Sequence, residues 1–387
     1  MSAHLCCLED LKRLIDAART YAGRIGSSIF DGIHADGVPE RITLALDKAF
    51  ELGIAASPDP LQPGFEFGIW GSSSHETGLK TSTEMLMAVA EVCGGLAMNL
   101  HVQGLASNCI THVGAALSAS QLKRVACAVQ EESGLPGYAT LSNPMLDAPA
   151  RIKTEAVAHE QGYVITGAKH FVYAMPETEA FVVFCHAAGT WGCFLVQAPA
   201  RGLLISPAGA RTGLRSCSLS HLAFSEVEVA QRLDNGNARM LLEHTLGLNW
   251  LGIAAIGTGI ATGAVRAARR YAAERYQGGT MIENLPAVRT LISEAMTNKE
   301  ASLALVRNSA ESFGGSGLLH TSAITRLAAL SLSASAVTDA LQVLGGYGYM
   351  EDYGMEKRLR DVTVLKSVAG TTQYLKRFIF ESAEVRP

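Results

Sequence analysis

The order of apolar patterns along the chain limits its fold more than any other feature. Apolar residues recur at helical spacing through residues 1 to about 120. Short β-type runs punctuated by glycines fill residues 125 to 232. Long segments rich in Ala, Leu and Val then return near 237–276, 285–313 and 320–345. A helix block, a strand block and a second helix block together predict an α+β protein.

We therefore expect three domains in the chain. The first is a helical domain at residues 1–122, in which the stretch from Thr83 to Leu105 suits a buried helix. The second is a β domain at residues 123–233, formed by an antiparallel sheet or barrel. The third is a helical bundle at residues 234–387. With 387 residues, 48% of them hydrophobic, the chain is able to bury a large core and a subunit interface.

The longest apolar stretch, from Leu251 to Val265, is too short to span a membrane. As a helix it is about 22 Å long, against the roughly 30 Å of a hydrocarbon core. Glycine costs helix stability, so its several glycines predict close approach of neighbouring helices. Those glycines are Gly252, Gly257, Gly259 and Gly263. The first ten residues lack the basic start and apolar core of a signal peptide, and we expect a soluble, cytoplasmic protein.

Charge and cysteine usage exclude several other classes. The 32 basic and 36 acidic residues are spread along the chain, so no nucleic-acid-binding surface is predicted. The eight cysteines form no Cys-x-x-Cys pair, which is typical of reduced thiols in the cytosol. His101 and His112 lack partners at ligand spacing, so we expect no metal site.

A glycine-rich motif near the C-terminus carries the strongest family signal. It reads Gln342-Val343-Leu344-Gly345-Gly346-Tyr347-Gly348-Tyr349. The segment 356–361 follows it, and then Gly370-Thr371-Thr372-Gln373. This order and spacing resemble the C-terminal signature of the acyl-CoA dehydrogenase superfamily. The resemblance extends over nearly the whole chain through the segments 163–169, 213–216, 222–229 and 271–275.

The resemblance implies an N-terminal helical domain, a β domain and a C-terminal four-helix bundle. It also implies bound FAD and usually a tetramer built as a dimer of dimers. The guanidinium of Arg275 would pair with the FAD pyrophosphate, and the two glycines of the motif would let a partner subunit's FAD approach the backbone. Phe171 would form an aromatic wall beside the flavin. The expected FAD-binding residues are Arg275, Gln342, Gly345, Gly346, Phe171 and Thr371.

The chain departs from the family at the catalytic base. In most members, a glutamate just before the Gly-Thr of the C-terminal motif removes the α-proton of the thioester, and this position is Ala369 here. In a minority, including isovaleryl-CoA dehydrogenases, the base comes from an earlier helix, at the position of Asn249. Neither residue acts as a general base. Trp250 also replaces the family arginine that helps to hold CoA.

A displaced base has to come from another segment if the chain has one. His101 is our leading candidate, because its helix lines the acyl pocket in the family and its reference pKa is near neutral. Tyr173 stands where the family has a small hydroxyl residue near the flavin, and would act as an acid or hydrogen-bond the flavin. The other candidates are carboxylates, namely Glu91, Glu131 and Glu132. Glu243 precedes Asn249 by six residues, so we expect it to lie on a different helical face.

We expect a FAD-dependent oxidoreductase that carries out α,β-dehydrogenation of an acyl thioester. The thioester is carried on CoA or on an acyl carrier protein, and electrons pass to an electron-transfer partner or to oxygen. One alternative is a flavin-dependent monooxygenase of the same fold, which needs no α-proton base. Another is a catalytically degenerate subunit that pairs with an active paralogue. The expected assembly is a homotetramer or a dimer, or a heteromer with such a paralogue.

Overall fold

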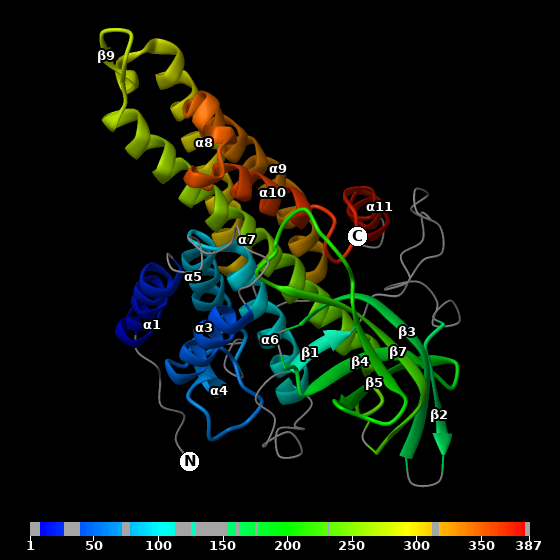
Figure 1. The fold of residues 1–387 in the computed structure, drawn as a ribbon. Helices are drawn as coiled ribbons and strands as arrows, with labels where there is room; N and C mark the ends of the chain where they lie inside the picture. The colour runs from blue at the N-terminus through cyan, green and yellow to red at the C-terminus, as the bar shows by residue number, and fades with distance from the viewer. Residues whose placement is uncertain are drawn as a thin grey trace.

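The computed structural model has a helical N-terminal part, a central curled sheet and a long C-terminal helical bundle (Figure 1). It describes residues 8–26, 39–71, 78–112, 125–128, 153–159, 162–174, 177–230, 232–311 and 317–383. The arrangement confirms the predicted α+β fold and the order of helix, strand and helix blocks. The domain boundaries proposed from the sequence remain predictions.

The N-terminal part contains one helix that is buried on all sides. Its described helices are α1 (Leu8–Tyr21), α3 (Pro39–Glu51), α4 (Gly64–Phe67), α5 (Gly78–Ala90) and α6 (Gly94–His112). Helix α6 is buried along almost its whole length, which explains an apolar pattern without a polar face. The sequence predicts one buried helix from Thr83 to Leu105. This prediction is wrong, because residues 91–93 are not helical and separate α5 from α6. Gly95 lies in the first turn of α6 and has no room for a side chain, because an added Cβ would lie 2.9 Å from Ser216 Cβ.

The central sheet is mixed. Its strands are β1 (Val125–Ala128), β2 (Glu155–His159), β3 (Gly162–Ala174), β4 (Ala180–Ala187), β5 (Thr190–Gln197), β6 (Leu203–Pro207) and β7 (Ser218–Val229). The strand order is β1-β4-β2-β3-β7-β6, with β5 paired to β4. The expectation of an antiparallel sheet is wrong at β4, which pairs in parallel with β1 and β2. Sequence runs do not encode strand direction, because direction depends on the connections between strands.

Irregular pairing in β3 turns one aromatic side chain toward the helices. The β3–β7 register shifts between Lys169 and Val172. Phe171 lies inside this irregularity with a left-handed backbone (φ 54°), and its side chain is about half exposed. A bulge of this kind re-aims a side chain out of the regular alternation of a strand.

The C-terminal bundle confirms the three long helical segments expected from the sequence. Its helices are α7 (Ala238–Glu274), α8 (Pro286–Glu311), α9 (Leu318–Val343), α10 (Met355–Leu365) and α11 (Thr372–Ala383). The hairpin strands β8 (Tyr276–Gln277) and β9 (Thr280–Met281) connect α7 toward α8. Helix α7 runs from beside the sheet to this hairpin at the tip of the bundle (Figure 1).

Helix α7 forms the centre of the molecule and packs closely on its neighbours. A Cβ added at Gly259 would lie 2.4 Å from the carbonyl oxygen of Met87, and one at Gly263 would lie 2.1 Å from that of Glu91. The glycines therefore allow close helix approach, as predicted. The expectation that the apolar segment is too short to span a membrane is wrong, because it lies within the 37-residue helix α7. In the described part of the chain, α7 is long and apolar enough to cross a membrane, but 89% of its most apolar window is buried inside the protein. Burial of this kind is typical of a core helix.

Candidate active site

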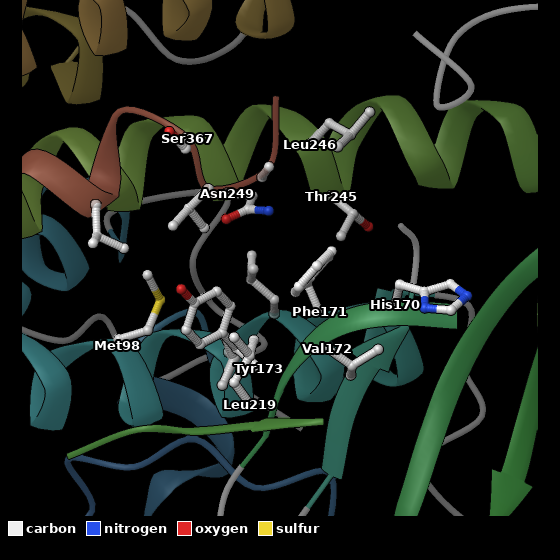
Figure 2. Close-up of a pocket in the computed structure, with 15 residues that line it drawn as sticks. Met98, His170, Phe171, Val172, Tyr173, Leu219, Thr245, Leu246, Asn249 and Ser367 are labelled. Atoms are coloured by element: carbon white, nitrogen blue, oxygen red, sulfur yellow. The ribbon is translucent and has the colours of Figure 1, made fainter. Parts of the chain in front are cut away.

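A cavity of about 330 Å³ lies where α6, β3 and α7 meet the segment between α10 and α11 (Figure 2). Most of its wall is apolar, including Met98 and Leu105 from α6. The polar side chains on the wall are His170, Tyr173, Thr245, Asn249 and Ser367. No carboxylate is among the described residues that line it. A largely apolar cavity with a few convergent polar groups is the usual form of a small-molecule site.

The two positions at which the resemblance predicts the base both lie on the wall of this cavity. Asn249 lies on α7, and Ala369 lies in the segment before α11. Figure 2 shows the Asn249 carboxamide descending from α7 toward Phe171 and Tyr173, which project from β3. The structure thus places both expected base positions opposite the predicted aromatic wall.

His101 lies behind the cavity wall, and its surroundings do not favour the role of base. It is fully buried, and both of its ring nitrogens are in hydrogen bonds. Its Nδ1 is 2.9 Å from Trp70 Nε1, and its Nε2 is 2.9 Å from Asn249 Oδ1. Burial lowers the pKa of His101 to about 4. The contact with Asn249 instead suits a residue that holds the cavity wall in place.

Tyr173 lies on the cavity wall and keeps its proton at neutral pH. Burial raises the pKa of its phenol well above the usual range, because a phenolate is poorly solvated there. The predicted role as an acid or hydrogen-bond donor is therefore consistent with its surroundings. A role as a base is not, because that would require the phenolate.

Glu91 and Glu243, the two of these carboxylates that the structure describes, lie in ion pairs away from the cavity. Glu91 pairs with Arg266 on α7. Glu243 pairs with Arg239 at 2.8 Å on an exposed helical turn. Glu131 and Glu132, and the loop residues around them, lie outside the described residues. Across the described ranges, no three His, Cys, Asp or Glu side chains gather as a metal site would require.

Trp250 is a core residue in this structure. Its side chain is fully buried, and its indole N–H donates to the carbonyl oxygen of Ala369 at 2.9 Å. Buried Arg326 donates to the same oxygen at 2.9 Å and to the carbonyl oxygen of Gly370 at 2.7 Å. These bonds fix the segment before α11, which forms part of the cavity wall. The position of the family's CoA-binding arginine therefore faces the protein interior.

Arg275 and the Gly345–Gly346 turn come together at the far end of α7. The Arg275 guanidinium lies 5.3 Å from the ring centre of Tyr347. Its Nε atom is buried and has no hydrogen-bond partner among the described residues. Gly345, with φ +56°, and Gly346 have open space where a Cβ would point. Gln342 is exposed on the last turn of α9. An orphaned guanidinium nitrogen beside open glycine backbone fits a dianionic pyrophosphate.

The expected FAD-binding residues form two separate groups in one chain. From Asn249 to Arg275, helix α7 rises about 39 Å. Phe171 lies at the cavity end, together with Thr371, which follows Ala369 closely. The Thr371 Oγ1 accepts the backbone N–H of Tyr374 at 3.2 Å at the start of α11. The Arg275 group lies at the other end of the helix.

Sequence reasoning missed a histidine pair beside the cavity. The Nδ1 atoms of His170 and His221 are 3.0 Å apart, and the rings of Phe171 and His221 form a T-shaped pair with centres 5.0 Å apart. His170 lines the cavity, although its ring points away from the other labelled side chains (Figure 2). The pair forms because β3 and β7 are neighbours in the sheet. No local pattern signals that pairing.

The comparisons with known proteins agree with this architecture. The model of the acyl-CoA dehydrogenase C-terminal domain matches residues 240–383. Cyclohex-1-ene-1-carbonyl-CoA dehydrogenase of Geobacter metallireducens is 30% identical over 310 residues, which cover 77% of this chain and 80% of that enzyme. The short-chain acyl-CoA dehydrogenase of Clostridium acetobutylicum is 29% identical, over 75% and 79% of the two chains.

Solved structures show the same fold at lower identity. The butyryl-CoA dehydrogenase of Megasphaera elsdenii matches with a TM-score of 0.81 at 19% identity, over 100% of both chains. Fold and relatives together define an oxidoreductase of the flavoprotein type. The chain belongs to the acyl-CoA dehydrogenase family, which implies FAD as its cofactor.

Proposed function

We propose that this protein carries out FAD-dependent α,β-dehydrogenation of an acyl thioester, or its reversal, in the cavity beneath α7. The main support for this proposal is that Asn249, Ala369 and Phe171 all line the same cavity. When bound, FAD supplies the acceptor for the hydride. The apolar wall holds the acyl chain and excludes water from the reacting carbons.

FAD binding would use both groups of residues. Arg275, Gln342, Gly345 and Gly346 would hold the pyrophosphate end of FAD, while Phe171 and Thr371 would lie beside its flavin ring. Because the two groups are about 39 Å apart along α7, we propose that each FAD is shared between two subunits. The functional unit is then a dimer or a homotetramer.

The thioester would be bound through its acyl group and the adjoining arm. Buried Trp250 offers no cation for the phosphates of CoA, so both acyl-CoA and an acyl carrier protein are candidate carriers. An electron-transfer flavoprotein or oxygen would accept the electrons. In the dehydrogenation direction the α-proton would pass to Glu131 or Glu132, the candidate bases that lie outside the described residues. Tyr173 would donate a hydrogen bond at the cavity, because its phenol stays protonated.

A second candidate function is a flavin-dependent monooxygenase of the same fold. It is favoured by one observation, namely that no carboxylate is among the described residues on the cavity wall. Such a reaction removes no α-proton. Oxygen uptake that depends on a reduced-flavin supply, but not on a thioester, is the expected sign of this activity.

Anaerobic titration of the FAD-loaded protein tests the leading proposal. We expect at least one thioester, from a panel carried on CoA and on phosphopantetheine, to remove the visible absorption of oxidised flavin. For the reverse direction, an enoyl thioester should restore the absorption of chemically reduced protein. If no thioester changes the flavin spectrum in either direction, the proposal is wrong.

Replacing Arg275 by alanine is expected to weaken FAD binding by about 10- to 100-fold. The reason is the loss of a charge-assisted hydrogen bond to phosphate, which is worth about 1.5–3 kcal/mol. Equilibrium dialysis of the apoprotein with FAD measures the change. Arg270→Ala is the matched control, because Arg270 is an exposed arginine on α7 that precedes Arg275 by five residues. Equal affinities for the two variants would exclude Arg275 from the FAD site.

A further inference from the structure

We infer that Asn249 presents a fixed N–H donor to the cavity, and that this donor selects ligands carrying a carbonyl oxygen. The orientation of Asn249 follows from its contact with buried His101 and from the contact of His101 with buried Trp70. The choice of a thioester as the ligand rests on the proposed function. The two parts are therefore tested separately.

The first contact fixes the protonation of His101. The indole N–H of Trp70 only donates hydrogen bonds. Its Nε1 lies 2.9 Å from His101 Nδ1, so Nδ1 accepts and carries no proton. A neutral imidazole with an unprotonated Nδ1 has its proton on Nε2. The lowered pKa of His101, which results from burial, is consistent with a neutral ring.

The second contact fixes the carboxamide of Asn249. His101 Nε2 lies 2.9 Å from Asn249 Oδ1, so the imidazole N–H donates to this oxygen. The amide oxygen is thus on the His101 side, and the NH₂ group is left for the cavity that Asn249 lines. Figure 2 shows the carboxamide among the cavity side chains. An amide held in this way donates hydrogen bonds and does not take up a proton.

The surrounding backbone is shaped to hold these three side chains. A Cβ added at Gly252 would lie 2.2 Å from His101 Cε1, so the imidazole packs directly on α7. Trp70 has a left-handed backbone (φ 62°), which is costly for a tryptophan. The backbone N–H of Trp70 donates to Ser82 Oγ at 3.0 Å, and its backbone carbonyl oxygen accepts from Asn108 Nδ2 at 3.1 Å. Trp70 and His101 are therefore positioning residues for Asn249.

A donor at this position gives the cavity a chemical preference. In a mostly apolar cavity, an N–H group without an acceptor loses its hydration without compensation. A thioester carbonyl oxygen accepts a hydrogen bond from the Asn249 NH₂ group. A thioether of similar shape has no such acceptor, so the NH₂ group stays without a partner. Sites built around a hydrogen bond reject analogues that lack the matching atom. The Asn249 amide is thus a specificity-determining group.

Nitrogen NMR on histidine-labelled protein tests the orientation. We expect the His101 signal to show an unprotonated Nδ1 and a protonated Nε2 at neutral pH, and His101→Phe assigns the signal by its loss. Trp70→Phe removes the indole N–H and should let His101 adopt both tautomers. A wild-type ring with its proton on Nδ1 overturns the inference, whatever the protein binds.

Calorimetry on the FAD-loaded protein tests the ligand preference. The probes are a 2,2-dimethylacyl pantetheine thioester, which has no α-hydrogen and cannot be dehydrogenated, and the thioether that lacks only its carbonyl oxygen. We expect the wild type to prefer the thioester about five- to tenfold, the effect of one net hydrogen bond. Asn249→Leu should abolish this preference without weakening thioether binding.

Thr245→Val is the control, because Thr245 also lines the cavity from α7 but takes no part in the contacts of His101. It should keep the preference. A preference that survives in Asn249→Leu overturns the inference while leaving the proposed function intact. If the wild type binds neither probe, the ligand part fails together with the proposed function, and the NMR result still decides the orientation.

Discussion

Replacing Asn249 by glutamate is expected to raise the rate of α-proton exchange of a bound acyl thioester roughly 100-fold or more. A positioned general base typically contributes about 10²- to 10⁴-fold to proton transfer. The wild-type amide at this position cannot take up the proton, and no described residue on the cavity wall is a carboxylate. Glutamate is one methylene longer than asparagine, so its carboxylate extends into the cavity.

Deuterium incorporation at the α-carbon, followed by mass spectrometry, measures this exchange without a complete turnover. Asn249→Gln is the matched control, because glutamine has the same length as glutamate but no basic carboxylate. It should exchange no faster than the wild type. Equal rates for the Glu and Gln variants would mean that the α-carbon does not bind near residue 249. That result would remove the main support for the proposed function.

The wild-type protein is expected to lose about 3 kcal/mol of stability through His101 alone as the pH falls from 6.5 to 4. Burial lowers the pKa of His101 from 6.5 to about 4 in the folded protein. Between these values the unfolded chain binds a proton that the folded chain does not. Stability therefore rises with pH through this range and falls when the protein is acidified. The loss is complete once the pH is below 4.

Urea unfolding at several pH values measures this effect. In His101→Gln, whose amide is able to bond both Trp70 and Asn249, the His101 share of the pH dependence should disappear. The difference between the wild-type and variant curves isolates that share from other groups. His159→Gln is the control, because His159 is exposed at the end of β2. A variant curve parallel to that of the wild type would show that His101 titrates normally in the folded protein.

Much of the fold was predictable because its signals are local. The segments near 237–276, 285–313 and 320–345 became α7, α8 and α9, since apolar periodicity is set by neighbouring residues. The direction of β1 and β2 against β4 was not predictable, because strand pairing joins distant segments. The histidine pair across β3 and β7 was missed for the same reason.

The sequence by itself determined which chemical groups are available. Asn249 and Ala369 carry no basic group at the two positions where the family resemblance predicts the base, and Arg275 with the Gly345–Gly346 motif predicts a phosphate site. Only the tertiary structure decided how these groups are used. It placed both base positions on one cavity and set His101 behind Asn249. Trp70, His101 and Asn249 come from three distant segments of the chain. A hydrogen bond between distant segments produces no periodic pattern in the sequence of either segment, so the sequence does not predict it.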